Sequence, residues 1–114
     1  MSDCIFCKSA NKEMDSEIVY ESDQVMAFND VNPQAPVHIL IIPKKHYESV
    51  MSFEETDQEI ISEIMFTAQK LARDFEIDGS GFRIVNNCGE EGGQTVNHVH
   101  FHLLGKRTLT WPPG

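Results

Sequence analysis

Short apolar runs separated by polar turns predict three strands in the first half of the chain. Ile18–Glu21 and Gln24–Asn29 predict two short strands on either side of a turn at Ser22-Asp23. The largely apolar run His38–Ile42 predicts a third strand. Pro43 closes that strand, because proline has no backbone N–H to donate to a neighbouring strand.

Helical spacing of apolar residues follows, from Thr56 to Phe75. Two competing capping boxes, at 52–55 and 56–59, leave the start of this helix open by about one turn. The apolar positions that carry the helical period are Ile60, Ile61, Ile64, Ala68, Leu71, Ala72 and Phe75.

Two more strands are predicted after the helix. Phe82–Asn86 follows a glycine turn at 78–81, and a glycine-rich loop then leads to the run His98–His102. If that run is a strand, its period of two points three histidines to one face and the two apolar residues between them to the other. One long helix among about five strands predicts an α+β meander.

Composition narrows the classes of function. The chain has 114 residues, which suits one domain over 1–114 that is small enough to gain from dimerisation. Its 18 acidic residues against 9 lysines and arginines give a formal charge of −9, which argues against nonspecific binding to nucleic acid or to a membrane surface. With neither a membrane-span pattern nor a signal-peptide pattern, the expected location is cytoplasmic, where cysteines stay reduced.

Three of the five histidines fall in the run His98–His102. A row of imidazoles can bind a metal, attack an electrophile or move protons near neutral pH. Glycines in the preceding loop allow backbone N–H groups to bind an anion, and Gln94 and Thr95 add side-chain donors. The combination predicts a phosphate site beside an imidazole nucleophile. The alternative is a hairpin loop followed by a strand with exposed histidines.

Cys4 and Cys7 have the two-residue spacing that lets two thiolates reach one metal. The pair alone is weak evidence, because tetrahedral zinc needs two further ligands. A redox pair is the competing interpretation, and it is poorer because no strand precedes the cysteines. Cys88 is most simply a small loop residue.

Several segments together resemble one known family. The run 98–104 resembles the histidine-triad (HIT) signature, His-φ-His-φ-His-φ-φ with φ apolar. The segment 27–38 is similar to the ribose-binding stretch of the Hint-like branch of that family, and 42–46 and the tail Trp-Pro-Pro-Gly at 111–114 are similar to later parts of it. The resemblance extends from Ile5 to Gly114.

The resemblance implies a HIT-like fold in a single domain. That fold has about five antiparallel strands in a meander sheet, one long helix and a short N-terminal helix. It also implies that two subunits join their sheets across a homodimer.

The resemblance further implies a set of catalytic residues. His100 would attack the α-phosphate of a nucleotide and form a nucleotidyl-histidine intermediate. His102 would contact the phosphate and protonate the leaving group, and Gln94 would brace the phosphate oxygens and position water. His38 would support the catalytic histidine. A hydrogen-bonded structural role for His38 is almost as well supported.

A nucleotide pocket is implied in the same way. Asp30 would accept both ribose hydroxyls, and Trp111 would shape the leaving-group pocket of the other subunit. The alternatives are a turn role for Asp30, ordinary core packing for the apolar residues and packing of the tail on its own subunit. The expected base slot is Phe6, Phe28, Val31 and Leu40, and the expected phosphate contacts are Asn87, Gly93, Gln94, Thr95, His100 and His102.

For the metal, the resemblance implies that His46 and His98 complete the site begun by Cys4 and Cys7. The zinc would be structural, because all four positions would come from protein and none would be open for catalysis. No catalytic metal is expected.

The implied activity is hydrolysis of the P–N bond in purine nucleoside 5′-phosphoramidates such as AMP-lysine, with AMP and GMP as related ligands. Alternatives are dinucleoside polyphosphate hydrolysis, which the Trp-Pro-Pro-Gly tail argues against, a non-catalytic nucleotide sensor or scaffold, and a zinc-binding module. Lys106 departs from the branch, which often has a second glycine there. Glu90 and Glu91 beside the site predict a preference for cationic leaving groups.

Overall fold

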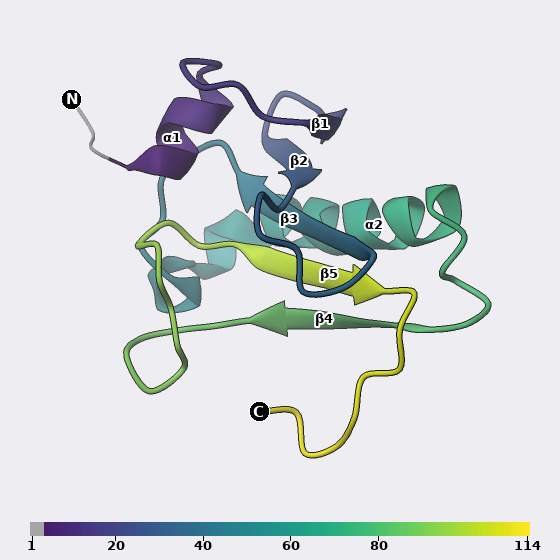
Figure 1. Ribbon diagram of the computed structural model, residues 1–114. Helices are drawn as coiled ribbons and strands as arrows, with labels where there is room; N and C mark the ends of the chain where they lie inside the picture. The colour runs from purple at the N-terminus through teal and green to yellow at the C-terminus, as the bar shows by residue number, and fades with distance from the viewer. Residues whose placement is uncertain (1–3) are drawn as a thin grey trace.

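Five antiparallel strands form one sheet in the computed structural model, which describes residues 4–114 (Figure 1). The strand order is β1-β2-β3-β5-β4, so β5 lies between β3 and β4 rather than at the edge. The five strands were predicted, but their order departs from a simple meander. The strands are β1 (Ile18–Glu21), β2 (Val25–Asn29), β3 (Val37–Pro43), β4 (Phe82–Asn86) and β5 (Phe101–Gly105).

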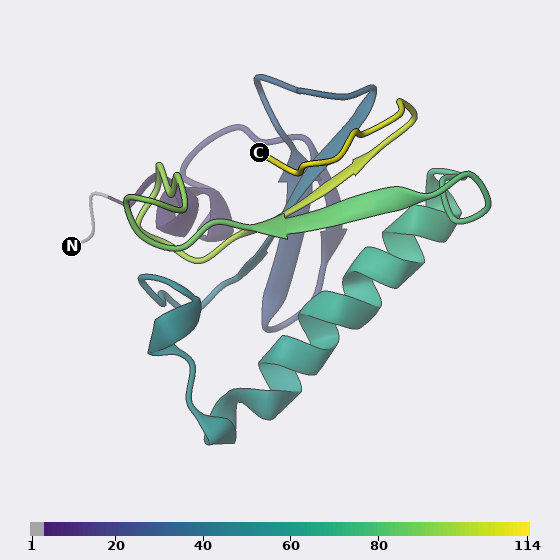
Figure 2. The same ribbon diagram turned by 90° about the horizontal axis from the view of Figure 1, so that it is seen from below.

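The long helix explains this order. α2 (Gln58–Asp74) follows β3 and carries the chain along one face of the sheet, so β4 enters at the sheet edge (Figure 2). β5 then returns antiparallel to both β3 and β4. Each strand pair is therefore antiparallel even though β3 and β4 are not neighbours.

The helices agree with the predicted spans except at the two ends of α2. α1 (Ile5–Ala10) is the expected short N-terminal helix. A 3₁₀ turn, η2 (Glu55–Asp57), precedes α2, and the Asp57 carboxylate accepts the Glu54 N–H at 2.8 Å. Neither predicted capping box is the one formed, because this 3₁₀ turn already uses Asp57 to hold the chain entering the helix. A second 3₁₀ turn, η1, covers Val50–Ser52.

Side chains that alternate between the two faces of the sheet form two separate apolar clusters. In β3, Val37, Ile39 and Ile41 belong to the core beneath α2, while Leu40 and Ile42 belong to a smaller cluster on the opposite face. That smaller cluster includes residues of α1, which covers part of this second face. Successive side chains of a strand point to opposite faces, so a fully apolar strand can serve both clusters.

The histidine run is only partly a strand. β5 begins at Phe101, so the strand expected over 98–102 is wrong for its first three residues. There the Val99 N–H bonds to the Tyr47 carbonyl at 2.7 Å, in a loop, instead of to a neighbouring strand. Val99 and Phe101 still enter the α2 core. The histidines consequently lie on the other face, as predicted from the period of two.

Among residues 4–114, no helix combines the length and the apolar character needed to cross a membrane.

Candidate functional site

Two groups of titratable side chains lie side by side on the sheet face opposite α2. One group brings together Asp30, His38 and His102, whose ligand atoms lie within 4.8 Å of one another. His100 lies between this group and a second one, with its ring centroid 5.1 Å from that of His102. The second group is Cys4, Cys7, His46 and His98.

His100 is held in one tautomer by the backbone. Its Nδ1 lies 2.8 Å from the carbonyl oxygen of His98. A carbonyl can only accept, so Nδ1 carries the proton and Nε2 keeps its lone pair. The amide of Asn86 donates to the His100 carbonyl at 2.9 Å, and Phe6 packs edge-on against the imidazole at 5.0 Å. The ring is therefore positioned with a nucleophilic nitrogen available.

A chain of hydrogen bonds likewise orders His102. The backbone N–H of Gln34 donates to Nδ1 of His38 at 2.9 Å, so the proton of neutral His38 is on Nε2. That Nε2 lies 2.9 Å from Nδ1 of His102 and donates to it. The proton of His102 is then on its own Nε2, which is buried without a hydrogen-bond partner among the described residues.

A buried donor without a hydrogen bond lowers the stability of the fold by about 1–3 kcal/mol. The presence of such a donor here therefore favours a ligand whose acceptor atom binds at this position. His102 lines two adjoining cavities, and its Nε2–H is the donor that the surrounding protein leaves available to a bound group.

Burial keeps these imidazoles neutral. Desolvation, followed by the neighbouring His100 and His38, lowers the pKa of His102 to about 4, and Asp30 opposes this shift. Burial also lowers the pKa of His38, again against the nearby Asp30 carboxylate, whose Oδ2 lies 3.4 Å from His38 Nε2. Near neutral pH both rings are therefore uncharged, as the hydrogen-bond chain requires.

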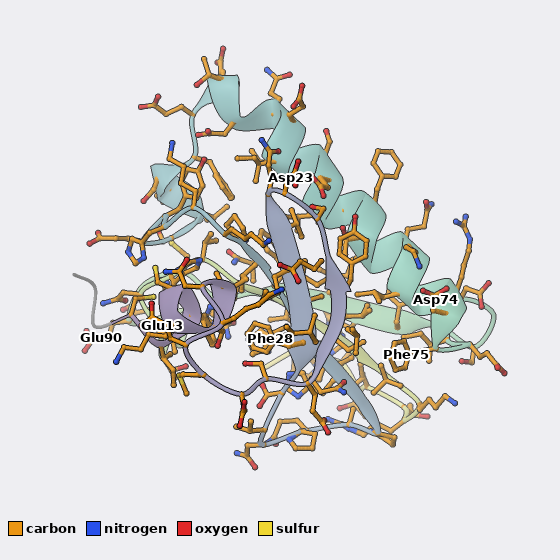
Figure 3. The ribbon with its side chains drawn as sticks, turned by 90° about the horizontal axis from the view of Figure 1, so that it is seen from above. Glu13, Asp23, Phe28, Asp74, Phe75 and Glu90 are labelled. Atoms are coloured by element: carbon orange, nitrogen blue, oxygen red, sulfur yellow. The ribbon has the colours of Figure 1, made fainter. Side chains whose placement is uncertain are left out.

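A cavity of about 280 Å³ opens beside His100 and His102. Phe6 and Phe28 meet edge to face in its wall, with centroids 5.6 Å apart, and Figure 3 shows Phe28 beside α1. Flat apolar walls of this kind suit a planar heterocycle. The predicted base-slot and ribose residues that line the cavity are Phe6, Phe28, Val31, Leu40 and Asp30, together with Thr95 from the phosphate set.

Val31 and Asp30 lie at the mouth of this cavity. Val31 is 98% exposed, so it forms an edge of the opening rather than part of the core. Asp30 is half-buried, and its Oδ1 accepts the Asn32 N–H at 2.8 Å. This bond orients the carboxylate while Oδ2 stays near His38.

The side chain of Gln94 makes its hydrogen bonds to the backbone of nearby loops, whereas the sequence predicted a contact with phosphate. Its Nε2 donates to the carbonyls of Glu48 and Val96 at 2.6 and 2.9 Å, and its Oε1 accepts the Gly89 N–H at 3.0 Å. The side chain therefore braces the glycine loop and does not line the cavity. Gly93, in the same loop, has φ +77°, which glycine adopts without strain.

Two other predicted residues lie outside this cavity. Asn87 lines the adjoining groove on the other side of His102. Trp111 is 81% exposed and does not line this cavity.

Sequence reasoning missed three contributors. Asn86 is the last residue of the strand predicted over 82–86, and its amide donates to the His100 carbonyl. Its pairing with Phe101 across β4 and β5 places it there, which depends on a strand order that no local pattern reveals. The backbone N–H of Gln34 and the side chain of Met14, which lines the cavity, carried no sequence signal.

The cysteines and two histidines form a candidate metal centre. Nδ1 of His98 lies 3.3 Å from Sγ of Cys4 and 3.4 Å from Sγ of Cys7, and Nδ1 of His46 lies 3.3 Å from Sγ of Cys7. Zinc bonds of about 2.3 Å to sulfur and 2.0–2.1 Å to nitrogen separate such atoms by about 3.5 Å in a tetrahedron. The donor spacing therefore fits zinc.

The tautomer of His98 also fits a metal ligand. Its Nε2 donates to the Pro43 carbonyl at 2.8 Å, so Nδ1 presents a lone pair toward the sulfurs. Burial lowers the pKa of this imidazole to about 4, so it stays neutral, as ligation requires.

Comparison with known proteins agrees with these features. The model of the HIT domain family matches residues 11–109. The chain is 46% identical over 114 residues to a 14 kDa zinc-binding protein of Brassica juncea, covering 98% of this chain and 100% of that protein. A HIT family hydrolase from Legionella pneumophila Philadelphia 1 superposes with a TM-score of 0.96 at 45% identity, covering 98% of this chain and 100% of that one.

A histidine triad nucleotide-binding protein from Candida albicans gives a TM-score of 0.87 at 31% identity, over 96% of this chain and 83% of that one.

Proposed function

The chain belongs to the HIT domain family, and from that premise we propose that it hydrolyses the P–N bond of purine nucleoside 5′-phosphoramidates such as AMP-lysine. The observation that carries this proposal is the fixed tautomer of His100, which leaves Nε2 unprotonated beside a cavity suited to a nucleoside. The similarity to a HIT family hydrolase and to a nucleotide-binding relative supports it.

The reaction has two displacements. Nε2 of His100 forms a bond to the α-phosphorus as the P–N bond to the leaving amine breaks. Nε2–H of His102 gives the leaving nitrogen its proton. Water then attacks phosphorus, the His100–phosphorus bond breaks, and a proton from that water returns to His102. The products are a nucleoside monophosphate and an amine.

Binding is assigned to the groups that line the cavity. Phe6 and Phe28 hold the purine ring between apolar surfaces, and Asp30 accepts hydrogen bonds from the ribose hydroxyls. Thr95 and the glycine loop, which Gln94 braces, supply donors to the phosphate oxygens. AMP and GMP are the expected product ligands.

Zinc is assigned a structural role. Cys4, Cys7, His46 and His98 supply four protein ligands, so no position is open to substrate. A bound zinc would hold the start of α1 against the segment that carries the nucleophile. Two metal-binding thiolates also suit a reducing compartment, so we place the protein in the cytoplasm.

A homodimer of this single domain is also proposed. Trp111 is largely exposed, which is unusual for such a large apolar ring without a partner to cover it. In a dimer the tail would reach the leaving-group side of the partner's site.

The deciding experiment is hydrolysis of an adenosine 5′-phosphoramidate by the purified protein beside His100→Asn. Clear turnover in the parent and near absence in the variant, with AMP still bound by both, is the expected result. If the parent is inert but binds AMP, the protein is a nucleotide sensor and the catalytic assignments are wrong. Turnover of diadenosine polyphosphate far above that of the phosphoramidate would instead favour the polyphosphate hydrolase alternative.

A further inference from the structure

A second hollow lies on the other side of His102 from the nucleoside cavity. It is a groove of about 230 Å³ lined by residues of β3, β4, β5 and the C-terminal tail. Both hollows are lined by His102, whereas His100 lines only the nucleoside cavity. A phosphorus atom held between these two histidines would thus have the nucleoside on one side and the groove on the other.

The groove is cationic although the chain is strongly acidic. Arg83 and Arg107 line it, and both also line an adjoining hollow of about 480 Å³ to which Lys106 contributes. Within residues 4–114, no carboxylate lies within salt-bridge distance of any of these three cations. In contrast, Lys12 and Lys44 are both paired with Glu21.

Backbone carbonyls hold the two arginines in place without neutralising them. Nη2 of Arg83 donates to the carbonyls of Leu109 and Thr110 at 3.3 and 2.9 Å. Nε of Arg107 donates to the Gln34 carbonyl at 2.7 Å, and its Nη1 donates to the Thr108 carbonyl at 3.3 Å. A guanidinium has five N–H donors, so each arginine keeps further donors and its full charge for another acceptor.

We propose that this groove binds the leaving group, and that it selects leaving groups that carry an anion, a carboxylate or a phosphate. The inference rests on the proposed function and names its substrate class. In a displacement at phosphorus the leaving group departs opposite the attacking atom. With His100 on the nucleoside side, the departing amine enters the cationic groove. A lysine joined through its side-chain nitrogen fits, because it keeps its α-carboxylate.

This assignment replaces the preference for cationic leaving groups suggested by Glu90 and Glu91. Both carboxylates are exposed and line neither the groove nor the nucleoside cavity. Figure 3 shows Glu90 at the outer edge of the molecule, away from Phe28. Exposed carboxylates at that position are screened by water and salt, whereas the arginines directly line the groove.

The test compares two matched substrates, the adenosine 5′-phosphoramidates of glycine and of glycinamide, which differ in a carboxylate against a neutral amide. We expect kcat/KM to favour glycine by about 5- to 10-fold at low salt, the range of partly exposed charge-assisted contacts, and this ratio to shrink as salt is added. Arg83→Gln, which removes a charge that lines the groove, should lower the ratio. Lys70→Gln removes the same charge on α2, remote from the groove, and should leave the ratio unchanged.

Equal kcat/KM values, or a preference for glycinamide, would overturn the proposal while leaving the phosphoramidase intact. If neither compound is cleaved, the proposed function fails, and calorimetric affinities of the two intact compounds then decide the inference. A tighter complex with the glycine compound that weakens in Arg83→Gln supports the anion groove, and equal affinities refute it. Faster cleavage of the adenosine 5′-phosphoramidate of 2-aminoethyl phosphate than of the glycine compound would identify the favoured anion as phosphate rather than carboxylate.

Discussion

The carbonyl of His98 accepts the Nδ1–H of His100 at 2.8 Å, while the ring of the same His98 faces the sulfurs of Cys4 and Cys7. One residue therefore contacts both the candidate metal centre and the candidate nucleophile. Phe6, which follows Cys4 by two positions, packs against both imidazoles at 6.0 and 5.0 Å. The position of His100 thus depends on whether the N-terminal segment is held in place against it.

Replacing a metal ligand should accordingly affect stability and catalysis together. We expect Cys7→Ser to lower zinc content and to lower Tm by about 10 °C, since each kcal/mol lost shifts Tm by roughly 4–8 °C in a domain near this size. Zinc measured by a colorimetric chelator and Tm by calorimetry check this. Cys88→Ser is the matched control, because Cys88 lies outside the metal group. This variant should keep the zinc content and the Tm of the parent. Unchanged zinc content in Cys7→Ser would refute the assignment.

His38 should act through His102 and not on substrate directly. Without the Nε2–H of His38, nothing fixes the proton of His102 on Nε2, and we expect His38→Leu, which has no side-chain donor, to lower kcat by about 10- to 100-fold. The loss should be largest for strongly basic leaving amines, which need the proton most, so a series of amine substrates measures it. A uniform loss across the series would mean that His38 is only structural.

Stability should depend on pH through His102. Its pKa falls from an ordinary value near 6.5 to about 4, so the unfolded chain takes up a proton first as the pH drops. The contribution of His102 to the free energy of unfolding is therefore fully present above about pH 6.5, and it is lost progressively as the pH falls toward 4. Urea unfolding of the parent and His102→Asn should show their difference in stability shrinking over this window. A difference independent of pH would contradict the assigned pKa.

Gly105 is required for packing at the end of β5. A Cβ added there would lie 2.7 Å from Cδ1 of Ile77, which is fully buried. We expect Gly105→Ala to lower the free energy of unfolding by about 1–3 kcal/mol through overpacking. Gly79→Ala, whose Cβ would meet nothing within 4 Å, should change it by no more than about 0.5 kcal/mol. In the Gly105→Ala variant, the additional change Ile77→Val should recover part of the lost stability. If it recovers none, the contact with Ile77 is not the cause of the loss.

Local patterns were sufficient for β1 to β4 and for α2, whereas α1 was expected only from the family resemblance and β5 begins three residues later than its pattern predicts. Strands 18–21 and 82–86 agree with the predicted boundaries, and the long helix differs only at its ends, because alternation and helical spacing are properties of neighbouring residues. The place of β5 between β3 and β4 depends instead on where α2 returns the chain, which no local pattern contains.

In the candidate site, too, some features follow from local patterns and others depend on the folded chain. That His100, His102 and Asp30 line one cavity could be predicted, because they lie in recognisable motifs. The contacts of Gln94 could not, because its partners Glu48 and Val96 belong to loops that meet only in the folded chain. Arg83 and Arg107 come from β4 and from beyond β5, and only the sheet register brings their charges to one groove.

The two hollows on either side of His102 also separate the routes of the two products. In the proposed reaction, the amine can depart through the groove while the nucleotidyl group stays bound to His100 in the nucleoside cavity. Whatever next enters the groove then meets the phosphorus atom, whether water or another nucleophile. Hydrolysis and nucleotidyl transfer to an acceptor would thus share every protein contact of the first step and would differ only in which molecule fills the vacated groove.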